Sequence, residues 1–92
     1  MELTELEQRA VKELVEEMQG RLDLEARNLT SAQFEFTKLQ IRVKLFGEES
    51  LEQKEREAYT RSYPEHIAKH EAGIARLQEQ IDVLRAYGQD GG

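Results

Sequence analysis

The sequence predicts an all-α fold, an antiparallel coiled-coil helical hairpin, and two observations support that prediction. The first is composition: of 92 residues, 38% are hydrophobic and 35% charged, with one proline and 7% aromatic residues, a balance typical of long helices and coiled coils. The second is the spacing of the apolar residues, which alternates between four and three in two separate stretches. Because so short a chain encloses little interior of its own, we expect the hairpin to assemble into a helical bundle.

The two apolar stripes have matching registers. If the chain reverses near Gly47, the residue numbers of facing positions in an antiparallel pair must add up to a constant. Facing members of the stripes add up to 95 or 96 over residues 11–32 and 63–84. The first stripe consists of Val11, Val15, Met18, Leu22, Glu25, Leu29, Ala32, Phe36, Leu39, Val43 and Phe46, and the second of Tyr63, Ile67, His70, Ile74, Leu77, Ile81 and Leu84.

A long first helix is predicted over residues 4–46. Thr4 followed by Glu7 makes a capping box, in which each side chain bonds the other residue's free backbone amide. The four–three rhythm keeps its phase across Gly20, so we expect one uninterrupted helix of about 60 Å at 1.5 Å per residue. Residues 39–45 also alternate apolar with polar residues, and an intermolecular strand there is the alternative.

The turn of the hairpin is predicted at residues 47–49. Gly47 suits a left-handed C-cap, because glycine adopts a positive φ without steric cost. Ser50 followed by Gln53 makes another capping box just beyond it. We therefore expect a second helix to begin at residue 50.

The second arm is predicted over residues 50–87. Pro64 removes an amide donor and crowds the preceding turn, so we expect the arm to be kinked or restarted there. Gly88 is expected to end the helix and to leave residues 88–92 as a flexible tail. The whole chain, residues 1–92, is predicted to form a single helical-hairpin domain.

The half of the hairpin near the turn lacks apolar cover in this register. Residues 34–46 are apolar nearly all round the helix, yet the same register sets Phe36 against Thr60, and the returning segment 51–58 is mostly charged. Leaving these side chains in water would forfeit on the order of 5–10 kcal/mol. We therefore expect this segment to bind a second copy of the chain and another protein. The predicted partner-binding residues are Phe34, Phe36, Leu39, Ile41, Val43, Leu45 and Phe46.

Glu25 and His70 interrupt the two stripes and face each other in the predicted register. We expect them to form a buried polar layer in which the carboxylate satisfies the imidazole. His66 lies one helical turn from His70, and these two histidines with Glu25 make the alternative, a metal-binding helical bundle. We expect no metal and no cofactor, because the first helix contributes no histidine.

The function predicted is that of a non-enzymatic interaction or assembly module, such as a small adaptor, an inhibitor or a structural protein. The sequence lacks a glycine-rich phosphate loop and a Ser/His/Asp or Cys/His arrangement in a suitable context. A net charge of −6 disfavours binding to nucleic acid, which requires clustered Lys and Arg. With no cysteine, no signal-peptide pattern and no apolar run of about 20 residues, we expect a cytoplasmic protein that does not bind membranes.

Overall fold

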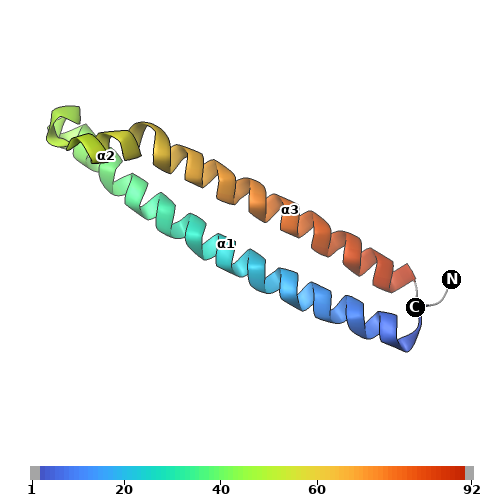
Figure 1. Cartoon of the computed structure of the whole chain (residues 1–92). Helices are drawn as coiled ribbons and strands as arrows, with labels where there is room; N and C mark the ends of the chain where they lie inside the picture. The colour runs from blue at the N-terminus through green and yellow to red at the C-terminus, as the bar shows by residue number, and fades with distance from the viewer. Residues whose placement is uncertain (1–2, 91–92) are drawn as a thin grey trace. The chain divides into compact units, whose positions relative to one another are not determined.

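The computed structural model describes residues 3–90, and the chain forms two compact units. We call residues 1–25 and 73–92 the terminal unit and residues 26–72 the apex unit. Within each unit, a stretch of the first arm lies antiparallel to a stretch of the second (Figure 1). The described residues are helical almost throughout and include no strand, so the chain is an all-α helical hairpin, as predicted.

Two long helices and three short helical segments make up the described part of the chain. Helix α1 spans Glu5–Phe46 and helix α3 spans Tyr63–Asp90. Between them come a 3-10 turn, η1, at Glu48–Ser50, the short helix α2 at Gln53–Glu57, and a π-helical turn, η2, at Ala58–Ser62. Because α1 is uninterrupted, residues 39–45 are helical and the strand alternative is wrong.

The predicted capping box at the start of α1 is confirmed. The Glu7 backbone N–H donates to the Thr4 hydroxyl at 3.1 Å, and the Thr4 backbone N–H donates to the Glu7 carboxylate at 3.4 Å. The two bonds satisfy amides that have no partner within the helix. Helix α1 therefore begins within one residue of its predicted start.

Burial along α1 and α3 follows the two predicted stripes. Every stripe member is buried or half-buried except Phe46, which is exposed. Among residues 3–89, the deepest side chains are Ile81 in the terminal unit, 3% exposed, and Leu51 and Leu39 in the apex unit, 4% and 8% exposed. The seam of the hairpin is therefore correctly predicted, but its core is thin.

The turn departs from the prediction in how it is capped. Gly47 has the expected positive φ of 83°, but its ψ of 164° lies outside the left-handed helical region. The capping box joins Glu52 and Glu55 instead of Ser50 and Gln53, with the Glu52 N–H donating to the Glu55 carboxylate at 3.0 Å. The Ser50 hydroxyl instead donates to the Gly47 carbonyl at 2.8 Å. Helix α2 thus begins later than predicted, because Ser50 closes the turn.

The second arm is interrupted just before Pro64 by the π-helical turn η2. The Tyr63 N–H donates to the Ala58 carbonyl, five residues back. Proline has no N–H, and its ring crowds the carbonyl four residues back, so a wider turn accommodates it. Tyr63 still has helical dihedral angles, φ −67° and ψ −45°, and α3 restarts there.

The π-helical turn also changes which side chains face α1 in the apex unit. The four–three rhythm places Thr60 on the seam, but the extra residue of a π-turn shifts that position to Tyr59. Phe36 contacts Tyr59 and Tyr63, with ring centroids 5.7 Å and 6.5 Å away. The predicted pairing of Phe36 with Thr60 is therefore wrong, and the Thr60 hydroxyl donates to the Arg56 carbonyl at 2.9 Å.

Helix α3 continues through Gly88 to Asp90, so the predicted helix end at Gly88 is wrong. A Cβ atom at Gly88 would lie 3.2 Å from Cγ1 of Val11, tighter than ordinary van der Waals contact. Glycine at this position thus allows α3 to approach α1 closely within the terminal unit. The rest of the predicted tail, residues 91–92, lies outside the described residues.

Candidate functional site

The seven predicted partner-binding residues lie on different faces of α1. The seam face, where Leu39 is buried and its two neighbours are half-buried, holds Phe36, Leu39 and Val43. The opposite, outward face holds Phe34, Ile41 and Leu45, which are 63%, 51% and 66% exposed. Phe46, the last residue of α1, is exposed as well. Three of the seven are thus at least partly covered within the chain and four remain open to solvent.

The three exposed apolar residues of the outward face of α1, together with Lys38, form a straight line along the helix. Phe34, Lys38, Ile41 and Leu45 are spaced four, three and four residues apart, which places them within about 60° of one another on the helix surface. The line is about 16 Å long at 1.5 Å per residue. We call these four residues the outer stripe.

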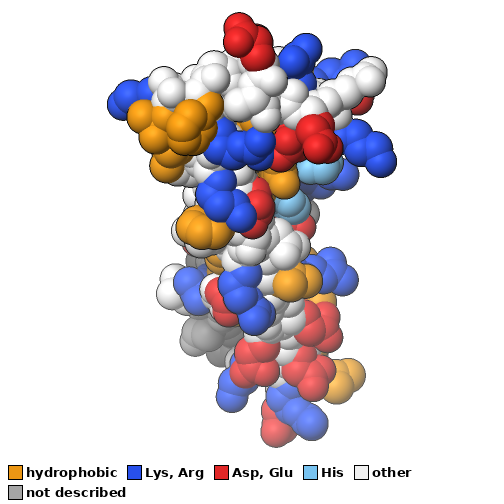
Figure 2. All heavy atoms as spheres, turned by 90° about the vertical axis from the view of Figure 1, so that its left-hand side faces the viewer, with side chains coloured by type: hydrophobic (Ala, Val, Ile, Leu, Met, Phe, Trp, Pro, Cys, Tyr) orange, Lys and Arg blue, Asp and Glu red, His pale blue; other side chains and the backbone are white. Residues whose placement is uncertain are grey.

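Lys38 covers part of the outer stripe with its own side chain. Its Nζ atom lies 5.2 Å from the centre of the Phe34 ring and 2.9 Å from Oε2 of Glu35. The aliphatic stem of a lysine shields apolar neighbours while its ammonium group stays in water. Figure 2, which faces the end of the molecule that carries the turn, shows hydrophobic side chains at the surface beside Lys and Arg.

Arg42 ties α1 to the turn and to α2 within the apex unit. Its guanidinium group pairs with the Glu55 carboxylate and donates to the Ser50 carbonyl at 2.9 Å. The hydrogen bond from Arg42, and then that from the Glu52 backbone, lower the pKa of Glu55. A groove of about 370 Å³ beside this pair is also lined by Lys38. The pair was not predicted from the sequence, because the turn at residues 47–52, which brings Glu55 to Arg42, has no α-helical register to follow.

The Arg42–Glu55 pair predicts a loss of stability in acid. Because the fold lowers the pKa of Glu55 below its ordinary 4.5, the pair stabilises the apex above pH 4.5 and this contribution disappears as pH falls through the folded-state pKa. Thermal unfolding followed by circular dichroism between pH 3 and pH 7 should therefore show a smaller loss of stability in acid for Glu55→Gln than for the unmodified chain. Glu57→Gln, at an exposed pair with Arg61, is the matched control and should retain the full loss.

In the terminal unit, Glu7 and Tyr87 join the two arms. The Tyr87 hydroxyl donates to the Glu7 carboxylate at 3.2 Å. Hydrogen bonds from Thr4, and then from Tyr87, lower the pKa of Glu7, while the same carboxylate raises the pKa of Tyr87. All three groups are satisfied by one another, so the cluster serves to hold the ends of the helices together.

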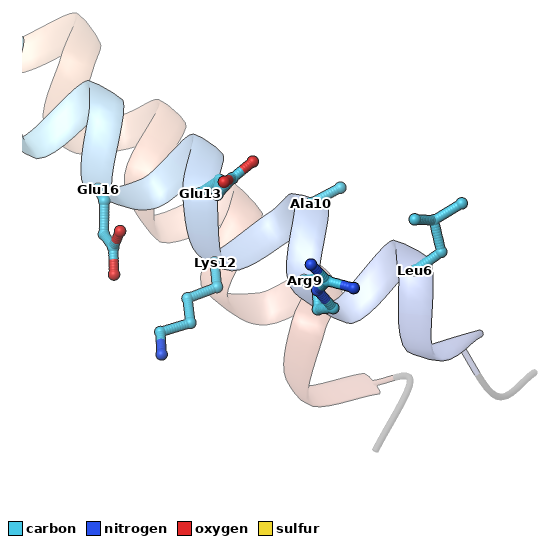
Figure 3. Close-up of a pocket in the computed structure, with 6 residues that line it drawn as sticks. All are labelled: Leu6, Arg9, Ala10, Lys12, Glu13 and Glu16. Atoms are coloured by element: carbon cyan, nitrogen blue, oxygen red, sulfur yellow. The ribbon is translucent and has the colours of Figure 1, made fainter.

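The hollows of the terminal unit are shallow. One of them is lined by Leu6, Arg9, Ala10, Lys12, Glu13 and Glu16. Figure 3 shows that all six side chains come from α1 and spread apart. A second, of about 440 Å³, is lined by Met18, Arg76, Glu79, Gln80, Val83 and Leu84. Neither has the converging polar groups of a site for a small-molecule substrate.

The polar layer of Glu25 and His70 stays a prediction. Glu25 belongs to the terminal unit and His70 to the apex unit. Both side chains are half-buried, and neither is without an interaction partner. His66 is exposed. Within residues 3–90, no three His, Asp or Glu side chains come together as the ligands of a metal ion, so the metal-binding alternative gains no support from the geometry.

Comparison with known proteins identifies no relatives: no protein-family model, curated protein or solved structure matches the chain. None of the helices in the described part of the chain combines the length and apolar character needed to cross a bilayer. The functional interpretation therefore rests on the surfaces and contacts described above.

Proposed function

We propose that the chain is a non-enzymatic protein–protein interaction module that self-associates through its apex unit and docks a partner protein through residues 34–46. Such a module would act as a small adaptor, inhibitor or structural protein, and its lack of cysteine suits the cytoplasm. The observation that carries the proposal is the outer stripe, whose Phe34, Ile41 and Leu45 are all more than half exposed.

The thin core supports the same proposal. Leu39, Leu51 and Ile81 are the only buried side chains among residues 3–89. Burial of apolar surface contributes about 25 cal/mol per Å², so a chain with so few buried side chains has much to gain from a second surface. Exposed apolar side chains grouped on one helix face are typical of interaction sites.

Replacing Ile41 by Asp should weaken self-association roughly tenfold or more without unfolding the chain. The unmodified chain is expected to sediment as a dimer or higher oligomer at micromolar concentrations. Ile41 is 51% exposed, so a carboxylate there is tolerated by the monomer but is desolvated at an interface, which is costly. Sedimentation velocity over a concentration series measures the effect.

The matched control is Gln40→Asp, which adds the same charge at a neighbouring exposed position of α1 outside the outer stripe. It should sediment as the unmodified chain does. If the unmodified chain sedimented as a well-folded monomer at hundreds of micromolar, the proposed self-association would be wrong.

A further inference from the structure

We infer that the outer stripe binds the outer stripe of a second copy in antiparallel orientation, an inference that rests on the proposed self-association and specifies its surface and register. Phe34 then meets Leu45 of the partner subunit, and Lys38 meets the partner's Ile41. The spacing of the stripe and the distribution of charge favour a second copy as the occupant, and the position of Lys38 favours the antiparallel orientation.

The spacing of the outer stripe is the same in both directions. Its four residues are separated by four, three and four positions, so an antiparallel copy brings every large side chain onto a stripe position of the other copy. The two facing residue numbers then always add up to 79. A surface that is its own complement in this way fits the isologous contact of a two-fold dimer.

Lys38 decides between the antiparallel and the parallel arrangement. In a parallel pair, Lys38 would face Lys38 of the partner subunit, and like charges at such short range repel. In the antiparallel pair, its aliphatic stem lies over Ile41 of the partner subunit, while the ammonium group, 2.9 Å from Glu35, stays at the edge in water. The antiparallel pair therefore places no lysine of the stripe against another.

The charge of the chain also favours contact through the apex unit. The apex unit contains eight acidic and eight basic residues, whereas the terminal unit contains eleven acidic and five basic residues, which accounts for the whole net charge of −6. Surfaces far from neutrality repel their own copies, and surfaces near neutrality associate more readily. Electrostatic repulsion between two copies is therefore weaker at the outer stripe than at the terminal unit.

The area of the stripe is that of a small contact. One side of Phe34, Lys38, Ile41 and Leu45, which are half to two-thirds exposed, offers on the order of 400 Å² per copy. Stable complexes bury about 800 Å² per partner, and transient ones less. We therefore expect a reversible dimer whose population rises with concentration.

Spin labels on the cysteine-free chain test the orientation and the register. Arg27→Cys and Ser31→Cys each introduce a unique label at an exposed position of α1 outside the four contact residues. In the antiparallel pair, the two labels of a dimer should lie about 37 Å apart along the helix axis at position 27 and about 25 Å apart at position 31. In a parallel pair, both distances should be about 10 Å.

The expected result is that the distance between the two labels of a dimer is about 12 Å shorter at position 31 than at position 27. Pulsed dipolar spectroscopy measures both distances at a concentration where sedimentation shows dimers. Adding Ile41→Asp should remove the dipolar signal and weaken association roughly tenfold or more, whereas adding Gln40→Asp should preserve both distances. Equal distances at the two positions, or a dimer insensitive to Ile41→Asp, would overturn the stripe pairing but leave self-association intact. A monomer at every concentration would overturn both.

Discussion

Replacing Ile81 by Ala should lower the free energy of unfolding by about 2–5 kcal/mol, a large share of the total for a domain of this size. Ile81 is 3% exposed and is the most deeply buried residue of the terminal unit. Truncation removes its apolar contacts and leaves a cavity, because the surrounding side chains close over the gap only in part. Urea unfolding followed by circular dichroism measures the change.

Val83, two residues further along α3, supplies the matched control because it is 63% exposed. Val83→Ala removes methyl groups from the same helix but creates no buried cavity, so its effect should stay within about 0.5 kcal/mol. Equal losses for the two variants would mean that the seam of the terminal unit is not the apolar core of that unit.

The residues that line the seam could be predicted from the sequence because a helical hairpin obeys one simple geometric rule. Side chains recur on a helix face every three to four residues, and an antiparallel partner makes facing residue numbers add up to a constant. Val11 and Ile81 each lie on a predicted stripe, and in the structure Val11 is half-buried and Ile81 is buried. The capping box of Thr4 and Glu7 was equally accessible, since both of its residues lie within one turn.

The apex was predicted less well because its structure depends on a single inserted residue. The π-helical turn before Pro64 places Tyr59 on the seam in place of Thr60. The four–three spacing of apolar residues does not predict such an insertion. The Arg42–Glu55 pair was missed as well, because it spans the turn between α1 and α2. Leu51, by contrast, was visible as an apolar residue in a charged segment, and it is the most deeply buried residue of the apex unit.

The candidate site was only partly accessible to sequence reasoning. A helix segment that is apolar nearly all round, as residues 34–46 are, does not reveal which of its faces the chain covers itself. Phe36 contacts Tyr59 and Tyr63, whereas Phe34 remains 63% exposed. Only the structure separates the seam face from the outer stripe, and this separation leads to the inference about a second copy.

Substituting Ala for Gly should have opposite effects on stability at Gly47 and at Gly20. Gly47 has φ 83° and ψ 164°, a backbone region essentially restricted to glycine, so Gly47→Ala should destabilise the chain by about 1–3 kcal/mol. Gly20 lies inside α1, where Gly20→Ala should stabilise it by roughly 0.5–1 kcal/mol. An added Cβ meets no atom within 4 Å at either site, so the difference between the variants reports the backbone preference alone. Thermal unfolding measures the change in stability of each variant. If Gly47→Ala also stabilised the chain, Gly47 would not have a positive φ in the turn at residues 47–49.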